Sequence, residues 1–420
     1  MTAEVARPSS LATRETVVLV AALASIYVVS QFLRNSVGVI APNLASELGL
    51  SASEIGLLSS VFFFSFAAAQ IPLGVALDRY GPRLCMLVCA GIAIAGALLF
   101  AFAPSPLWLI AARVLMGLGS SAYLMAPLAL YAKRYAPDRF ATLVGLQLGL
   151  GTLGTLLATA PFAFAVALIG WRMSFVVIAG LVLAAAVLVT VVVRDDRQEA
   201  SRARESLRDS LSGTLQAVRI PSFWPVFALQ LGSYSSFVVV VGLWGGPYLT
   251  HIYGYSLTER GNMLFVAVLA QIVGAMLWGP TDRLLNSYKI PVLTGHLLTA
   301  AAFGLAAVVG VFSPAALLVW FLAIGLFPAV LPVLIAHGKS LFPPHLVGRG
   351  MTLMNIGTMG GVFVCQTVTG FIIDLFPPAG DGYALDAYRS VFAFQAGFIL
   401  LACLAYSFSS DPRRNPRTWG

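Results

Sequence analysis

One arginine within a long apolar segment is the side chain of this sequence best placed to do chemistry. Arg34 lies inside residues 17–41, whereas all 17 carboxylates fall in loops, termini or the ends of apolar segments. An arginine at mid-membrane depth costs about 2.5 to 3.5 kcal/mol on insertion scales, so it needs an opposite charge, water or many hydrogen bonds. Its planar fork of donors matches carboxylate or phosphate oxygens. An incoming anion would supply the missing charge, unless Arg34 only bonds backbone carbonyls or reaches toward the membrane surface.

Other polar residues recur at helical spacing around this arginine and in later apolar segments. Tyr27, Gln31, Arg34, Asn35 and Gly38 form one stripe on a helix. The predicted substrate-binding residues are Arg34, Tyr27, Gln31, Asn35, Gln230, Tyr234, Trp244, Asn355 and Gln366. The alternative for each polar residue is that it only joins helices by hydrogen bonds of modest energy. Because the position 205 residues beyond Arg34 is Val239, a single positive group would face the ligand, which favours a monoanion.

Three further titratable residues fall within apolar segments. We predict a structural or proton-relay role for Arg113, His296 and His337. Imidazole titrates near neutral pH, so either histidine would be able to carry a coupling proton in place of a buried carboxylate. Packing or gating is the alternative role for both.

The composition indicates the elements that must position these side chains. The chain has 420 residues, of which 59% are hydrophobic and 10% charged, with a mean hydropathy of +0.89. So few charges cannot solvate a globular surface of this size, and a bilayer core takes roughly 20 residues of helix. The sequence predicts an all-α polytopic membrane protein with twelve spans, at 17–41, 53–77, 84–103, 106–131, 140–167, 172–193, 222–250, 260–279, 289–311, 314–338, 347–375 and 388–410.

The distribution of charge predicts the orientation of these spans. The net charge is +8, but 20 of the 25 basic residues fall in the termini and in alternate loops, while the opposite loops hold only Arg172, Arg260 and Arg389. The positive-inside rule therefore predicts that both termini are cytoplasmic, which an even number of spans requires. This pattern argues against nucleic acid as a partner. We expect a multi-pass protein of the bacterial inner membrane.

An internal repeat divides the chain into two halves. Residues 49–56 read Gly-x-Ser-x-Ser-Glu-x-Gly and residues 254–261 read Gly-x-Ser-x-Thr-Glu-x-Gly, with Pro42 repeated as Pro247. An offset of 205 between equivalent segments predicts two six-helix bundles related by a pseudo-twofold axis. The predicted parts are a cytoplasmic N-terminus at 1–16, bundles at 17–193 and 222–410, a linker at 194–221 with an amphipathic helix, and a cytoplasmic C-terminus at 411–420.

A charged loop between two spans carries a family resemblance. Residues 74–83 read Gly-Val-Ala-Leu-Asp-Arg-Tyr-Gly-Pro-Arg, which resembles the loop after the second helix of the major facilitator superfamily. The fourth span, with Arg113, Gly117 and Gly119, resembles a second motif of that family. The pair Asp282-Arg283 repeats Asp78-Arg79 in the second half. The resemblance implies that the loop and this second pair form a conformational latch by pairing with neighbouring helix ends. The latch residues would be Gly74, Asp78, Arg79, Gly81, Arg83, Asp282 and Arg283.

Within that superfamily, the first span is most similar to the anion:cation symporter and organophosphate antiporter branches. In those proteins an arginine eight residues before a proline contacts the substrate anion, and Arg34 precedes Pro42 by that spacing. The acidic residue that often precedes the arginine is Leu33 here, and the acidic position after the fourth-span glycines is Ser120. These departures leave the coupling ion open.

The expected function is a secondary active or facilitative transporter of a small organic anion, working by alternating access as a monomer. The alternatives are an exporter of amphiphilic metabolites or drugs, which the aromatic run at residues 62–66 would accommodate, and a transporter-like sensor. The sequence shows no nucleophile with its base, no metal-ligand cluster and no phosphate loop, so we expect neither an enzyme nor a cofactor. The expected partners are an anionic small molecule, the lipid bilayer and a coupling proton.

Overall fold

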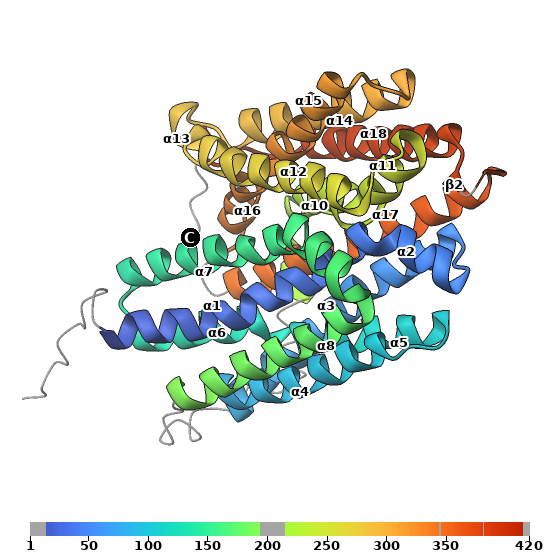
Figure 1. The fold of residues 1–420 in the computed structure, drawn as a ribbon. Helices are drawn as coiled ribbons and strands as arrows, with labels where there is room; N and C mark the ends of the chain where they lie inside the picture. The colour runs from blue at the N-terminus through green and yellow to red at the C-terminus, as the bar shows by residue number, and fades with distance from the viewer. Residues whose placement is uncertain (1–13, 194–214, 344–345, 381, 415–420) are drawn as a thin grey trace, which may run out of the picture.

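The computed structural model describes residues 14–193, 215–343, 346–380 and 382–414. Long helices run nearly side by side, and the helices of the first half lie below those of the second half in Figure 1. The first half contains α1 (Arg14–Asn35), α2 (Val37–Leu48), α3 (Ala52–Tyr80), α4 (Pro82–Ala101), α5 (Pro106–Ser120), α6 (Ala122–Arg134), α7 (Pro137–Leu157) and α8 (Ala160–Val192).

The second half repeats this order of elements. It contains α10 (Phe223–Val239), a π-helical segment (Val240–Trp244), α11 (Gly245–Tyr253), α12 (Leu257–Trp278), α13 (Thr281–Leu284), α14 (Lys289–Val309), α15 (Pro314–Leu326), a 3-10 turn (Pro328–Val330), α16 (Leu331–Ser340), α17 (Val347–Asp374) and α18 (Leu385–Ser407). Strands β1 (Pro378–Ala379) and β2 (Gly382–Tyr383) form a short antiparallel hairpin between α17 and α18, with Pro378 opposite Tyr383.

The predicted all-helical, twelve-span architecture is confirmed. Eleven helical segments among the described residues are long and apolar enough to cross a membrane, and a shorter apolar helix at Thr142–Leu157 occupies the fifth predicted span. That span continues through residues 160–169 of α8. Gly170, with φ of 74°, separates them from the sixth span at residues 171–192. Glycine is the residue that adopts such a positive φ without steric cost.

The repeated motif forms the same local structure twice. Gly49 and Gly254 end α2 and α11 with φ of 66° and 68°. In the next turn, the side chain of Ser51 or Ser256 accepts the N–H of the glutamate three residues later, and that glutamate bonds back to the serine. These reciprocal capping boxes satisfy backbone donors that a helix N-terminus leaves free. The repeat seen in the sequence is therefore also a structural repeat.

The first and fourth spans of each half are interrupted near their middle. The breaks fall at Ser36 between α1 and α2, at Ser121 between α5 and α6, in the π-helical segment of the seventh span and in the 3-10 turn of the tenth. Interrupted helices free backbone groups at membrane depth, which proteins tolerate where the segment is buried in protein or lines a ligand site. The predicted binding residues Arg34 and Asn35 lie directly before one of these breaks.

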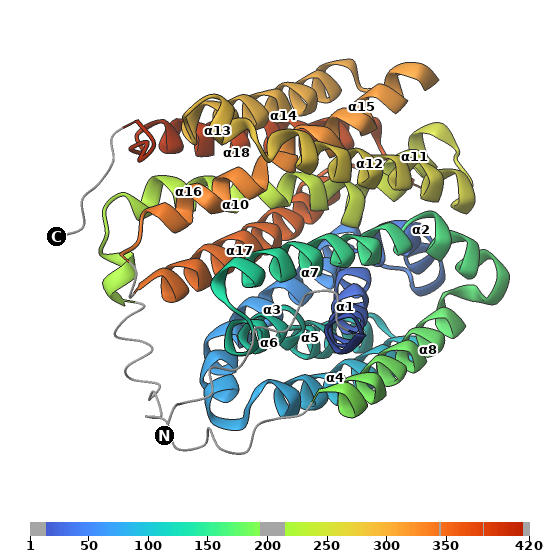
Figure 2. The ribbon, with the colours of Figure 1, turned by 90° about the vertical axis from the view of Figure 1, so that its left-hand side faces the viewer.

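The two ends of the bundle differ in how the halves meet. We call the end that holds Gly49, Gly254 and the β1–β2 hairpin the distal end, and the opposite end, where α1 begins and α18 ends, the proximal end (Figure 1). Figure 2 shows α2 and α11 next to each other at the distal end. Across the halves, α3 packs on α17, α8 on α12, and α2 on α11. Most of the predicted amphipathic helix of the linker, at residues 194–214, lies outside the described residues.

Candidate functional site

Arg34 lies in the last turn of α1 and is 6% exposed. Its guanidinium carbon stands 4.8 Å from the centre of the Phe66 ring, and its buried Nε has no hydrogen-bond partner. No carboxylate among the described residues pairs with it. The carbonyls at a helix C-terminus and the face of an aromatic ring both favour a cation, but neither neutralises it. The side chain therefore retains an uncompensated positive charge between the two halves.

Tyrosines from both halves lie near this charge. Tyr27, two turns before Arg34 on α1, is close enough to interact electrostatically with Arg34 and with Tyr234 of α10. Its ring packs on Gly151 of α7, where an added Cβ would lie 2.1 Å from the ring. Gln230 lies one turn before Tyr234, and its side-chain oxygen is buried without a donor. The structure thus brings Tyr27, Arg34 and Tyr234 together.

Two amides from opposite halves meet at the π-helical segment. The Asn35 side chain donates to the carbonyl of Gln31 at 2.9 Å, and Gln366 of α17 donates to the carbonyl of Val238 at 3.4 Å. A Cβ placed on Gly242 would lie 3.5 Å from Asn35 Oδ1 and 3.7 Å from Gln366 Nε2. The N–H groups of these amides are used by carbonyls, whereas the amide oxygens of Asn35 and Gln366 are buried without donors.

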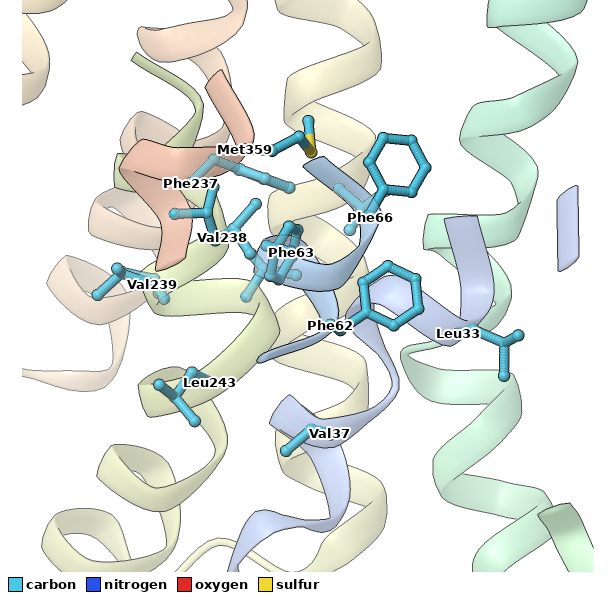
Figure 3. Close-up of a cluster of buried hydrophobic side chains, with 14 of the residues drawn as sticks. Leu33, Val37, Phe62, Phe63, Phe66, Phe237, Val238, Val239, Leu243 and Met359 are labelled. Atoms are coloured by element: carbon cyan, nitrogen blue, oxygen red, sulfur yellow. The ribbon is translucent and has the colours of Figure 1, made fainter. Parts of the chain in front are cut away.

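A cluster of buried hydrophobic side chains from both halves accompanies these polar residues. Leu33 and Val37 of the first span and three phenylalanines of α3, at 62, 63 and 66, belong to one cluster with residues 237–239, Leu243 and Met359 of the second half (Figure 3). Phe62 packs edge-on against Phe63, with 5.6 Å between ring centres. Apolar walls lower the local dielectric and strengthen the field of the unpaired arginine.

Two predicted binding residues lie apart from this group. The indole of Trp244 donates to Thr369 Oγ1 at 2.8 Å, and its ring meets Tyr383 of the distal hairpin, so its polar group is already used in the distal packing. Asn355 lies 11 residues before Gln366 on α17, about 16 Å at 1.5 Å per residue, so one small ligand does not reach both. We therefore restrict the central cluster to Tyr27, Gln31, Arg34, Asn35, Gln230, Tyr234 and Gln366.

Arg113 is fully buried, but its donors are already engaged. Its guanidinium donates to the carbonyls of Leu33 at 2.5 Å, Leu58 at 3.2 Å and Ser59 at 3.5 Å, and lies 4.7 Å from the ring of Phe62. The side chain thereby ties α5 to the end of α1 and to α3. Of the two roles predicted for Arg113, this geometry suits the structural one.

Both histidines within spans have partners on each ring nitrogen. His296 bonds the carbonyl of Val292 through Nδ1 and Ser233 Oγ through Nε2, at 2.7 and 2.8 Å. His337 bonds the Tyr406 hydroxyl and the carbonyl of Ser410 near the proximal end, and stacks on Tyr288. A carbonyl only accepts, so the ring nitrogen beside each carbonyl carries a proton, and in the neutral ring the other nitrogen accepts from the hydroxyl. Neither histidine is hydrogen-bonded to the central cluster.

Two of the predicted latch residues, Arg83 and Asp282, form bonds within their own halves. Arg83 donates to the carbonyl of Thr190 at the end of α8, at 2.8 Å, and Gly81, with φ of 80°, separates α3 from α4. Asp282 pairs with Arg413 of the C-terminal segment. Gly74, Arg79 and Arg283 are exposed, and the side chain of Asp78 lies outside the described part. No bond between the halves involves these residues in the part of the chain that the structure describes.

Among the described residues, the side-chain bonds that join the halves lie distal to the central cluster or at the distal end itself. Asp374 at the end of α17 accepts the N–H groups of Ala52 and Ser53, in the first turn of α3, at 3.0 and 2.8 Å. Arg260 bonds Asn43, and Thr367 bonds Ser60 at 2.9 Å. Sequence reasoning missed this role of Asp374, because capping of α3 by α17 depends on helix packing.

Glycines allow the backbones of the two halves to touch at this end. A Cβ on Gly38 of α2 would lie 2.3 Å from the carbonyl oxygen of Val241, and one on Gly246 would lie 2.0 Å from that of Gly38. A Cβ on Gly56 would lie 2.6 Å from the carbonyl oxygen of Gln366. Real Cβ atoms do not approach oxygen so closely, so only glycine permits this distal closure.

Asp374→Asn is expected to weaken the distal closure by about 1 kcal/mol, because a carboxylate near a helix N-terminus contributes about 0.3 to 2 kcal/mol. A shift of that size changes the open population roughly fivefold. The readout is the rate at which a membrane-impermeant maleimide labels Ser60→Cys, since Ser60 is fully buried between the halves and the four native cysteines are buried. Glu259→Gln, which removes the charge of a capping carboxylate within one half and keeps an acceptor oxygen, should leave labelling unchanged. Equal labelling rates in the two variants would contradict the assignment of Asp374.

Comparison with known proteins identifies the family. The sequence pattern of the Major Facilitator Superfamily matches residues 23–247 and 240–420, which together span nearly the whole chain. The chain belongs to the Major Facilitator Superfamily. A bacterial homologue of the human lysosomal transporter Spinster superposes on this superfamily member with a TM-score of 0.74, at 17% identity, covering 95% of this chain and 97% of that one.

Relatives within the superfamily are named for small organic anions. A probable sulfoacetate transporter of Cupriavidus necator is 28% identical over 65% of this chain and 65% of its own length. The hexuronate transporter of Bacillus subtilis is 25% identical over 87% of this chain and 90% of its own. These proteins are transporters, as is the chain described here, and the expectation that it is not an enzyme is confirmed.

Proposed function

We propose that this transporter carries a small organic anion of the carboxylate type by alternating access, with Arg34 as the counter-charge. The observation that supports it most strongly is the buried guanidinium of Arg34, which no described carboxylate pairs and whose Nε lacks a partner. A carboxylate accepts two parallel N–H bonds from such a fork. The ligand would supply the negative charge that balances Arg34.

The number of negative charges that a ligand would carry follows from the number of positive groups in the central cluster. Val239, the counterpart of Arg34 in the second half, is a fully buried aliphatic residue. The central cluster therefore offers one positive group, together with tyrosines and amides, which suits a monoanion with polar substituents. Hexuronate, for which one relative is named, is a monoanion with hydroxyl substituents. Sulfoacetate, for which another is named, is a dianion that also carries a carboxylate, so the two names together support an organic anion as the substrate.

Alternating access requires that the distal contacts separate in the opposite state. The present arrangement, with Asp374 capping α3 and Gly38 against the π-helical segment, corresponds to a state closed at the distal end. We propose that the proximal end, with its excess of arginine and lysine, faces the cytoplasm and that the latch residues of segment 74–83, which forms the end of α3 and the start of α4, pair across the halves when that end closes. The proposed mechanism therefore has one end closed by the distal contacts and the other closed by the latch, with the binding residues between them.

The test is uptake by the purified protein reconstituted into liposomes. Time-dependent accumulation of labelled glucuronate or sulfoacetate, absent from protein-free liposomes, is expected. A parallel series of thermal unfolding curves, with glucuronate, sulfoacetate, tartrate and the neutral sugar glucose, should show stabilisation by an anion and none by glucose. Stabilisation by neutral solutes alone would contradict the substrate class, and anion binding without movement would indicate a sensor.

A further inference from the structure

A separate polar pocket lies at the distal end, between the halves. Its volume is about 410 Å³, and its polar lining comes from Asn43 and Ser46 of α2, Thr250 and His251 of α11, and Arg260 of α12. Both halves therefore contribute to it. The central cluster around Arg34 contributes none of its lining residues.

Arg260 is the charged residue of this pocket and is 4% exposed. Its Nη1 donates to the hydroxyl of Thr250 at 2.8 Å, its Nη2 donates to the side-chain oxygen of Asn43, and its buried Nε has no partner. Both partners are neutral. Arg260 also lies in the first turn of α12, where the helix dipole disfavours a cation. Within the described part of the chain, the guanidinium is thus both buried and uncompensated.

The neighbouring described carboxylates are engaged elsewhere. Glu47 accepts the indole N–H of Trp171 and pairs with Arg172, and the Trp171 bond together with Arg172 holds the pKa of Glu47 below its usual value. Glu259 caps its own helix, and Asp374 caps α3. Along the described ranges, then, the protein supplies no carboxylate to Arg260.

His251 adds a second donor to the same pocket. Its Nδ1 accepts the backbone N–H of Tyr383 at 3.3 Å and lies 2.8 Å from the Tyr388 hydroxyl. A nitrogen that accepts a backbone N–H carries no proton, so in the neutral ring the proton sits on Nε2. No hydrogen bond to Nε2 occurs among the described residues. Among the lining residues that the structure describes, the pocket therefore combines a guanidinium and an imidazole donor without an anionic group to receive them.

We propose that the distal pocket binds a small monoanion, with Arg260 as its counter-charge and His251 as a second donor. Because the lining comes from both halves and Arg260 already reaches Asn43 across them, the bound anion strengthens the distal closure. A carboxylate and a halide share the chemistry that this site recognises, and both fit the volume. The site is distinct from the one formed by Arg34, so its existence does not depend on the proposed substrate.

The experiment measures anion-dependent thermal unfolding of the full-length protein in detergent. Arg34→Gln is the background, which removes the proposed central site, and sodium acetate or sodium chloride is titrated at constant ionic strength against a bulky sulfonate salt. We expect a saturable rise in Tm with at least one of the two anions. Adding Arg260→Gln should abolish that rise, whereas adding Arg172→Gln, which alters an arginine already paired with Glu47, should preserve it. No rise in the background protein, or the same rise in the Arg34→Gln/Arg260→Gln protein, would overturn the proposal.

Asn43→Asp provides a second test that does not remove the arginine. The new carboxylate would stand where Asn43 already meets Arg260, and would act as a built-in counter-ion. In the Arg34→Gln background we expect a higher Tm without added anion and no further rise on titration. An undiminished rise in this variant would show that the anion does not bind at Arg260.

Discussion

Arg34→Gln is expected to lower the rate of organic-anion uptake by about 10- to 100-fold. A hydrogen bond to a charged group contributes about 1.5 to 3 kcal/mol, and each 1.4 kcal/mol changes an affinity tenfold. Glutamine keeps a donor at this position but removes the charge that no described carboxylate balances. The thermal stability of the unliganded variant should stay equal to or above that of the wild type, because an uncompensated buried charge is removed. Uptake in proteoliposomes and Tm without ligand are the two measurements.

Arg113→Gln is the matched control for this prediction. Arg113 is as deeply buried as Arg34, but its guanidinium donates to three carbonyls of α1 and α3. Its replacement should lower Tm, since the carbonyls lose their donors and the helices lose their tie. The two arginines therefore predict opposite outcomes for stability. Unchanged uptake in Arg34→Gln, with a normal Tm, would exclude Arg34 as the substrate's counter-charge.

Gly38→Val is expected to block the distal closure and to leave the transporter open at that end. Even the first carbon of the new side chain would lie 2.3 Å from the Val241 carbonyl oxygen, which belongs to backbone of the other half. Overpacking costs about 1 to 3 kcal/mol where neighbours yield, and this backbone has little room to move. The cost applies only to the closed arrangement, so each half should still fold. Labelling of Ser60→Cys by an impermeant maleimide should rise about tenfold or more, and uptake should fall in parallel.

Gly145→Ala of α7 is the control, because a Cβ at Gly145 would meet open space. This variant should label and transport as the wild type does. If Gly38→Val leaves the labelling of Ser60→Cys unchanged, the close contact of Gly38 with the π-helical segment is not required for closure. Loss of uptake without a rise in labelling would point instead to damage within the first half.

Local patterns predicted much of this architecture because they act over a few residues. The serine and glutamate that begin α3 and α12 form capping boxes, and the glycines before them adopt positive φ, as their spacing indicates. Arg34 falls inside the first span, and no acidic residue is close to it in the sequence. In contrast, helical spacing alone groups Trp244 and Asn355 with the binding residues. Spacing shows which residues share a face of one helix, but it does not show which residues of another helix lie opposite that face.

The sequence by itself determined the spans, their repeat and the isolation of a positive charge, since apolar length against bilayer thickness and helix-end chemistry are local properties. Only the tertiary structure decided which of these groups remain unpaired. Asp374 could have neutralised an arginine but caps α3, and Asp282 bonds Arg413 within its own half. Such pairings bring together residues as far as 322 positions apart, and they depend on the rotation and register of packed helices.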